Sequence, residues 1–245
     1  MNPIVVIPAR LASTRLPRKP LALIGREPMI VHVWRRAIAA AVGPVVVAAA
    51  DAEIADAVAA AGGRAILTRP DHPSGSDRAF EALTVLDPDG RHDVVVNLQG
   101  DLPLIDPASI RAALGPLADA AVDIATLAAP ILDASERDAA SVVKIATAFA
   151  PGATVARALY FSRLPVPWGD GPHYHHIGIY AYRRAALARF VALPPGQLER
   201  RESLEQLRAL EAGMQIAVAL VDTVPFGVDT PDDLARARAL FSAAS

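Results

Sequence analysis

A group of cations follows the first apolar segment of the chain. The stretch "VVIPARLASTRLPRKPL" contains four cations and no acidic residue, namely Arg10, Arg15, Arg18 and Lys19. Its prolines restrict the backbone, while guanidinium and ammonium groups donate charge-assisted hydrogen bonds to anions. With the small polar Ser13 beside them, these cations suit the binding of a polyphosphate. A solvated basic loop is the alternative that composition alone leaves open.

A second loop combines small polar residues with the start of a predicted helix. In "RPDHPSGSDRAF", the residues Ser74, Gly75 and Ser76 precede a helix that we expect to open at Asp77. Backbone amides and hydroxyls at such a position can point toward a nucleobase or a phosphate. An ordinary helix cap, with Ser76 as the N-cap, explains the same pattern.

Two aspartates remain once the helix caps have been assigned. Asp106 precedes a proline and suits an N-cap, and Thr230 can cap the C-terminal helix in "GVDTPDDL". Asp101 and Asp229 have no such role, and Asp101 directly follows an apolar strand-like run. Two free carboxylates beside a phosphate-binding loop are what a magnesium site requires. Unpaired surface aspartates are the alternative explanation.

The segment "HHIGIYAYR" alternates between apolar and polar side chains. Ile177, Ile179 and Ala181 are expected on one face of a strand, and His176, Gly178, Tyr180 and Tyr182 on the other. The polar face suits a pocket wall for a hydroxylated ligand, or else an exposed aromatic face. Farther along the chain, Glu199, Glu202 and Gln206 share about one face of a predicted helix, a stripe that is usually solvated.

The elements that must position these side chains follow a βαβα rhythm. Short β-branched runs such as "IVVI", "PVVVAAA" and "DVVVNLQ" alternate with alanine-rich amphipathic stretches, which predicts a parallel sheet covered on both faces. From about residue 135, three strand-like runs follow one another without helices, which predicts an antiparallel excursion. We therefore predict an α/β fold with a mixed, mostly parallel sheet, formed by one domain over residues 1–245 with an antiparallel subregion at about 135–183.

Bulk composition narrows the class of protein. The 245 residues are 53% hydrophobic, enough for one large core, and the net charge of -2 leaves no global basic field for nucleic acid or an anionic membrane. The absence of cysteine excludes disulfides and thiolate chemistry. No apolar run is long enough for a signal-peptide core or a membrane span, so we expect a soluble protein. The lack of cysteine is compatible with a reducing cytoplasm. The glycine fingerprints of dinucleotide-binding folds and P-loops are missing, which disfavours a dehydrogenase.

Seven motifs in order across almost the whole chain carry a family resemblance. They are "IPARLASTRLPRKPL", "DHPSGSDR", "VNLQGDLP", "ALYFSR", "HHIGIYAYR", "LEQLR" and "GVDTPDDL". Together they resemble the 3-deoxy-manno-octulosonate cytidylyltransferase family, also called CMP-Kdo synthetases. The resemblance implies a nucleotidyltransferase-type, Rossmann-like α/β body and a homodimer formed through the antiparallel excursion. It also implies transfer of CMP from CTP to 3-deoxy-manno-octulosonate (Kdo) with Mg²⁺ and release of pyrophosphate, in the cytoplasm, for lipopolysaccharide biosynthesis.

The resemblance also assigns roles to individual residues. It implies that the CTP phosphates are bound by Arg10, Ser13, Arg15 and Lys19, with Arg15 and Lys19 also acting in catalysis. It places Ser74 and Gly75 near the cytosine, Gln99 near the sugar, and the carboxylates of Asp101 and Asp229 on the magnesium ion. The segments that would shape the Kdo pocket contain Arg163, His176, Tyr180, Glu202 and Gln206.

The chain departs from the family pattern at three places. Leu102 stands where the family commonly has Glu, Ala50 precedes Asp51 where Thr or Ser is frequent, and the loop between Trp168 and His175 is short. The loss of the acid at position 102 puts in question any part that it has beside the metal.

Two other functions remain open from the sequence. The same reaction on another acidic 2-keto sugar, such as an 8-amino Kdo analogue or a sialic-acid-like acid, needs the same cations and aspartates. A nucleotide-binding regulatory protein without turnover would need no metal between two substrates, so the presence of both aspartates argues against it.

Overall fold

The computed structural model describes residues 1–243, which divide into two compact units. The first unit comprises Met1–Ile110 and 225–243, and the second comprises Arg111–Val224. Within the described residues, no helix is both long and apolar enough to cross a membrane. A single domain over residues 1–245 stays a prediction, and its last two residues lie outside the described part.

Parallel strands form the centre of the first unit. In order across the sheet they are β5 (Arg64–Leu67), β4 (Val45–Ala49), β1 (Pro3–Ala9) and β6 (Val94–Asn97). All three pairings between them are parallel. Every residue of β4 and β6 is buried, as expected for valine-rich strands that are covered on both faces.

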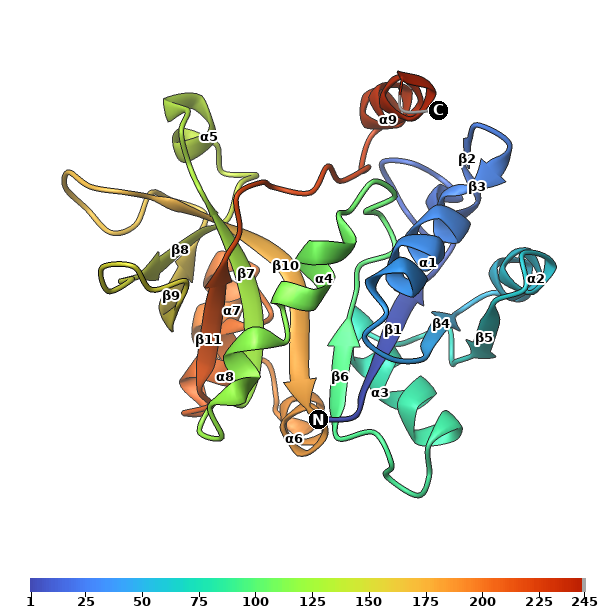
Figure 1. Ribbon diagram of the computed structural model, residues 1–245, viewed down its shortest axis with the longest axis horizontal. Coiled ribbons are helices and arrows are strands. Elements are labelled where there is room, and N and C mark those ends of the chain that lie inside the picture. The colour runs from blue at the N-terminus through green and yellow to red at the C-terminus, as the bar shows by residue number, and fades with distance from the viewer. Residues whose placement is uncertain (244–245) are drawn as a thin grey trace. The chain divides into compact units, whose positions relative to one another are not determined.

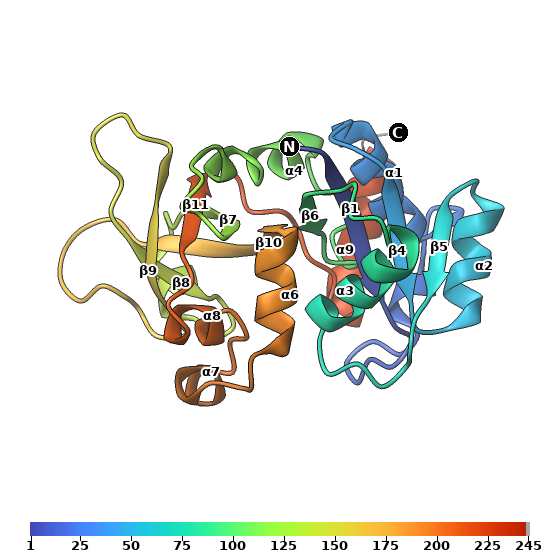
Figure 2. The same ribbon diagram turned by 90° about the horizontal axis from the view of Figure 1, so that it is seen from below.

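Helices cover both faces of these strands. The longer ones are α1 (Met29–Ala40), α2 (Ala52–Ala60), α3 (Gly75–Leu86) and α9 (Pro231–Ala243). Helices α1 and α3 lie on opposite faces of β1, as Figures 1 and 2 show together. A short hairpin, β2 (Leu23–Ile24) with β3 (Glu27–Pro28), follows the 3₁₀ turn η1 (Lys19–Leu21).

The strand order creates a reversal point beside β1. From β1 the chain passes to β4 and β5 on one side, and it then crosses to β6 on the other side. In open α/β sheets, ligands bind at the carboxyl ends of the strands where the order reverses in this way. The loops that follow β1 and β6 are therefore the places to expect a site.

A small apolar cluster joins the C-terminal helix to the start of the chain. It contains Leu16, Ile24, Met29, Val228 and Leu234, with Ala237 beside them. Leu16 belongs to the loop that carries Arg10, Arg15, Arg18 and Lys19, called the cationic loop below, and Val228 precedes Asp229. This packing therefore brings the two chemically important segments, more than 200 residues apart in sequence, to one place.

The second unit contains mixed pairings. Its strands are ordered β10 (Tyr174–Arg183), β7 (Ile124–Pro130), β11 (Ile216–Leu220), β9 (Val155–Ser162) and β8 (Lys144–Thr147). Only β7 and β11 pair in parallel, and the other pairings are antiparallel. Strands β8, β9 and β10 lie in the region predicted to be antiparallel, and the predicted mixed α/β fold is confirmed.

The helices of the second unit are short. They are α5 (Ala134–Asp138), α6 (Arg184–Ala192), α7 (Gln197–Glu202) and α8 (Leu207–Glu211), with the 3₁₀ turn η2 (Gly115–Ala118). Figure 2 shows α6, α7 and α8 along one side of these strands. Helix α4 (Pro107–Ala112) spans the boundary between the units in sequence.

The prediction of one continuous helix through "ERRESLEQLRAL" is wrong. Helix α7 ends at Glu202, Ser203 adopts a left-handed conformation with φ of 54°, and α8 begins at Leu207. The carbonyl groups of Glu202 and Ser203 accept hydrogen bonds from the Arg163 guanidinium at the point where the helix ends. The long-range contact to Arg163 therefore accompanies the break.

Candidate active site

A cavity of about 380 Å³ opens at the carboxyl ends of β1 and β6. All of its lining residues belong to the first unit. The lining includes every residue that the sequence assigned to CTP, to the magnesium ion and to the catalytic cations, namely Arg10, Ser13, Arg15, Lys19, Ser74, Gly75, Asp101 and Asp229, together with Gln99. The structure thus brings these nine residues to one cavity, while their individual roles stay predictions.

Two acids at the start of helix α2 hold the cationic loop in place. The backbone N–H of Leu11 donates to Asp51 Oδ2 at 2.8 Å, and the Arg18 guanidinium pairs with Glu53. Arg18 is therefore occupied outside the cavity. Arg10, in contrast, makes no ion pair within residues 1–243. Its guanidinium lines the cavity as an available partner for an anion.

Lys19 joins the two aspartates that capping leaves over. Its Nζ lies 2.8 Å from Asp101 Oδ2 and 2.9 Å from Asp229 Oδ1, and its side chain is only 16% exposed. Burial alone would lower the pKa of Lys19, but the two carboxylates outweigh burial and raise it. Arg15 reaches the other oxygen of Asp229 at 3.1 Å. The two carboxylates therefore converge on one cation.

Backbone contacts hold the two aspartates side by side. The N–H of Val228 donates to the carbonyl of Asp101 at 2.9 Å. One residue later, the N–H of Asp229 donates to Asp233 Oδ2 at 3.1 Å. Thr230 caps helix α9 as predicted, since its Oγ1 accepts from the Asp233 N–H at 3.2 Å. Asp229 is consequently fixed by the first turn of α9.

The donor set fits a magnesium ion. Mg²⁺ prefers oxygen ligands and is commonly held by one or two carboxylates together with substrate phosphates and water. Asp101 and Asp229 already converge on a positive charge, the ammonium of Lys19. Within residues 1–243 no group of three or more acidic, histidine or cysteine side chains is placed to hold a metal. Two carboxylates completed by a nucleotide are therefore the arrangement that fits.

The second loop corrects one cap assignment. Ser74, not Ser76, is the N-cap of α3, because Ser74 Oγ accepts from the Asp77 N–H at 3.2 Å and donates to Asp77 Oδ2 at 2.6 Å. Ser76 is buried inside the first turn. A Cβ atom at Gly75 would lie only 3.2 Å from Pro8 Cγ, so a residue without a side chain suits this close approach of α3 to β1.

Two ionisable residues of the cavity were missed by the sequence reasoning. His72 and Arg78 line the cavity, and both are buried. A signal for Arg78 was present, because it stands at helical spacing with the buried Ala79, Ala82 and Leu83 and so falls on the core-facing side of α3. His72 lies in the motif "DHPSGSDR", but the sequence reasoning assigned it no role.

In the second unit, His176 and Tyr180 lie together on β10, with ring centroids 5.5 Å apart. Both sets of alternating side chains are largely buried, so the alternative of an exposed aromatic face is wrong. His176 Nε2 lies 3.0 Å from Thr126 Oγ1, and burial lowers the pKa of His176 to about 3. Burial also raises the pKa of Tyr180 well above its usual value. Both side chains are therefore neutral near pH 7.

Two of the other sugar candidates, Glu202 and Arg163, form a hydrogen-bond network in the same unit. The Glu202 carboxylate accepts from Ser162 Oγ and from the Arg163 N–H, both at 2.9 Å. The Arg163 guanidinium donates to carbonyl groups, among them that of Glu202 at 2.8 Å. Gln206 is 6% exposed, and its Nε2 has no hydrogen-bond partner within the described residues. Because α7 ends at Glu202, the predicted shared helix face of Glu202 and Gln206 is wrong.

Comparison with known proteins defines the class first. Residues 4–216 match the family described as "Cytidylyltransferase". A solved structure described as CMP:2-keto-3-deoxy-manno-octonic acid synthetase complexed with CTP is 41% identical, with a TM-score of 0.91 and full coverage of both chains.

Two relatives identify the family more specifically. A 3-deoxy-manno-octulosonate cytidylyltransferase of Rhodospirillum centenum is 69% identical over 98% of this chain and 93% of its own. One of Methylobacterium radiotolerans is 68% identical over 98% of this chain and 96% of its own. The chain belongs to the 3-deoxy-manno-octulosonate cytidylyltransferase family.

Proposed function

We propose that this protein transfers CMP from CTP to Kdo and releases pyrophosphate, with the reaction taking place at the cavity of the first unit. The observation that carries the proposal is the convergence of Asp101 and Asp229 on one cation beside a loop of further cations. Relatives of 69% and 68% identity carry the name of this activity, and the likeness to a structure solved with CTP supports the nucleotide.

The reaction needs no nucleophile from the protein. The hydroxyl oxygen on C2 of Kdo attacks the α-phosphorus of CTP in line and forms a new phosphodiester bond. The bond between the α-phosphorus and its bridging oxygen to the β-phosphorus breaks, and pyrophosphate leaves. The hydroxyl proton passes to solvent or to a carboxylate. The protein therefore acts mainly by positioning and by neutralising charge.

The cations of the cavity have a defined task in this scheme. The lining contains four guanidinium or ammonium groups, Arg10, Arg15, Lys19 and Arg78, against the carboxylates of Asp101 and Asp229. This positive excess offsets the repulsion between the nucleotide and the acidic sugar. Arg15 and Lys19 bind the aspartates when no phosphate is near. During the reaction they release the aspartates and bind the departing pyrophosphate.

Asp101 and Asp229 are the residues that would hold Mg²⁺. When bound, Mg²⁺ supplies charge neutralisation at a phosphate oxygen and lowers the pKa of the attacking hydroxyl. The chain has Leu102 where the family commonly has Glu, so we assign no third acid to the ion.

We assign the recognition of Kdo to the polar groups of the second unit. Gln206 offers a buried amide nitrogen with no other partner, which a sugar hydroxyl or carboxylate would satisfy. His176 and Tyr180, with ring centroids 5.5 Å apart on β10, are the candidates to bond hydroxyl groups of the sugar. Arg163 and Glu202 bond each other and nearby backbone groups, so we infer that they shape the pocket wall.

Pyrophosphate release tests the proposal and identifies the sugar. The protein is incubated with CTP and Mg²⁺, alone and with Kdo, an 8-amino Kdo analogue or N-acetylneuraminic acid. We expect rapid release only with Kdo, and a phosphodiester product in the ³¹P spectrum. Faster pyrophosphate release with another acid would identify that acid, and not Kdo, as the sugar substrate. Binding of CTP without release on any 2-keto sugar acid would identify a nucleotide-binding protein without turnover.

A further inference from the structure

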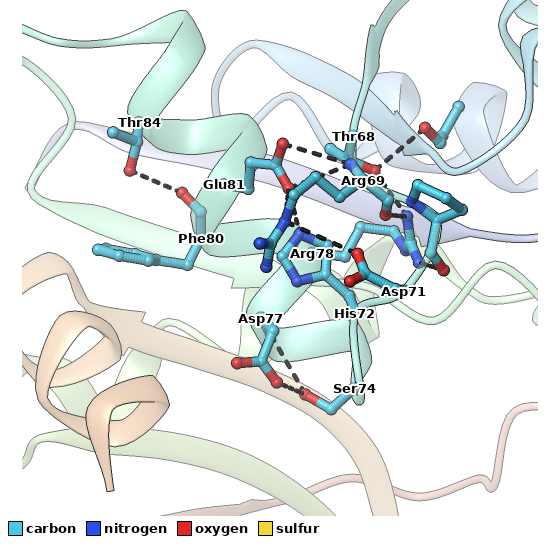
Figure 3. Close-up of polar contacts among 12 residues, drawn as sticks. Thr68, Arg69, Asp71, His72, Ser74, Asp77, Arg78, Phe80, Glu81 and Thr84 are labelled. Atoms are coloured by element: carbon cyan, nitrogen blue, oxygen red, sulfur yellow. Dashed lines mark hydrogen bonds and ion pairs between the residues drawn. The ribbon is translucent and has the colours of Figure 1, made fainter.

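The wall of the cavity next to α3 is a segment without regular secondary structure. Residues 68–74 connect β5 to α3 and contribute His72 and Ser74 to the lining, with Gly75 following at the start of the helix. If this loop were mobile, nucleotide binding would have to order it, and the cost of ordering would weaken the affinity for the nucleotide. The surrounding residues must therefore hold the loop in place. Figure 3 shows the polar contacts that hold this segment.

Arg78 makes three of these contacts. Its side chain is buried, and Nη1 donates to Thr68 Oγ1 at 2.6 Å and to the carbonyl of Arg69 at 2.8 Å. Nη2 donates to the carbonyl of Pro70 at 3.3 Å. Thr68 Oγ1 in turn donates to the carbonyl of Ala49 at 3.1 Å. One guanidinium thus connects α3, the segment and the end of β4.

Two acids on the same helix complete the attachment. Glu81 accepts from the N–H of Arg69 at 3.2 Å and bonds His72 Nε2. Asp77 accepts from Ser74 Oγ at 2.6 Å. Three side chains from the first turns of α3 therefore form hydrogen bonds with the segment near its beginning, at its middle and at its end (Figure 3).

We propose that Arg78 is a positioning residue for the nucleotide: it fixes residues 68–74 so that His72, Ser74 and Gly75 form a preorganised wall of the CTP cavity. This inference rests on the proposed function. A direct contact of Arg78 with the nucleotide is the competing role, because the side chain also lines the cavity. Both terminal nitrogens of Arg78 already donate to the segment, which favours positioning.

Thr68→Val separates the two roles. Valine has nearly the shape of threonine and removes one acceptor of Arg78, and Thr68 is buried outside the cavity lining. If Arg78 is a positioning residue, both variants raise the Kd and KM for CTP. We expect an increase of about fivefold in Thr68→Val and about tenfold in Arg78→Lys, while kcat changes less than about twofold. The double variant is less impaired than the product of the single effects.

Hydrogen exchange in the ligand-free protein supplies the second readout. Both variants should accelerate amide exchange in a peptide that covers residues 68–76. The matched control is Thr84→Val, which removes a hydroxyl that donates to the Phe80 carbonyl within α3, and it should leave exchange and CTP binding unchanged.

Two results overturn the proposal. In the first, Thr68→Val leaves CTP binding and exchange as in the wild type while Arg78→Lys weakens binding, which identifies direct contact. In the second, exchange accelerates in both variants without any change in CTP binding, which identifies a purely structural role. If the wild type binds CTP but releases no pyrophosphate with any sugar, the proposed activity fails, while exchange and CTP binding still decide the role of Arg78.

Discussion

At the scale of single residues, Lys19 determines the charge balance of the cavity. Its ammonium lies between Asp101 and Asp229 and neutralises part of their charge. A divalent cation that binds these carboxylates must compete with this ammonium, whereas a nucleotide offers the ammonium another partner. We therefore expect nucleotide and metal to bind with positive coupling.

Removing the ammonium tests this competition. Lys19→Met keeps the length of the side chain and removes its charge, so Mn²⁺ in the absence of CTP should bind about three- to tenfold more tightly. Binding of CTP should weaken in the same variant. Titration followed by electron paramagnetic resonance measures the free Mn²⁺ directly.

The control for this variant lies in the same loop. Arg18→Met also removes a cation, but Arg18 pairs with Glu53 outside the cavity, so Mn²⁺ affinity should stay at the wild-type value. Equal or weaker Mn²⁺ binding by Lys19→Met would contradict the competition.

Capping rules explain why some site residues could be predicted from sequence and others could not. Asp101 and Asp229 stood out because neighbouring residues could already account for the helix caps, and Thr230 indeed caps α9. Arg78 and His72 reach the cavity through the packing of α3 and the course of the preceding segment. Those contacts depend on tertiary structure, which local sequence rules do not describe.

At the scale of elements, the first turn of α9 holds Asp229 in place. Thr230 and Asp233 form a reciprocal cap, in which Asp233 Oδ2 also accepts from the Thr230 N–H at 2.9 Å. Thr230→Ala should lower the free energy of unfolding by about 1 kcal/mol. Chemical denaturation measures this change. Ser242→Ala, which removes a hydroxyl bonded to Arg238 at the other end of α9, should cost clearly less, and equal losses would argue against the cap.

Strand β10 gives the protein a pH-dependent stability. His176 is neutral when folded because burial lowers its pKa to about 3, while an unfolded chain has a histidine pKa near 6.5. Below pH 6.5 the histidine binds a proton in the unfolded state but stays neutral in the folded state. The stability that is fully present above pH 6.5 is therefore lost as the pH falls toward 3. The slope from this residue is at most about 1.4 kcal/mol per pH unit.

The variant His176→Gln should remove this contribution. Between pH 7 and 5, its unfolding free energy should fall less steeply than that of the wild type, as denaturation at several pH values would measure. His173→Gln, in the loop before β10, should keep the wild-type slope. If His176→Gln and the wild type have parallel profiles, His176 is not the residue responsible.

Element types in the first unit followed from local patterns, and those in the second unit only in part. Valine-rich runs predicted β4 and β6 because strands buried on both faces need little else. Alternation in β10 suggested one polar face, yet both faces are covered. The break at Ser203 arises with contacts to Arg163, which is 40 residues away.

At the scale of the whole molecule, the homodimer stays a prediction from the family resemblance. The second unit has large apolar side chains in contact with solvent, including Leu132 at 94% and Trp168 at 99% exposure. Aromatic residues such as Trp168 are enriched at interfaces relative to the rest of the protein surface. Sedimentation velocity should give twice the chain mass of 25.7 kDa at micromolar concentration. A single species with the mass of one chain would contradict the dimer.

We propose that the function of the whole protein depends on the carboxylates of Asp101 and Asp229 acting at the transferred phosphate. The most direct test is the steady-state rate of pyrophosphate release with CTP, Kdo and saturating Mg²⁺ in Asp101→Asn. Asp106→Asn is the matched control, because Asp106 caps α4 by accepting from the Ala108 N–H at 2.8 Å and asparagine caps equally well. We predict that Asp101→Asn lowers kcat by at least about 100-fold with little change in CTP affinity, and that Asp106→Asn stays within about twofold of the wild type. An unchanged kcat in Asp101→Asn would contradict the account.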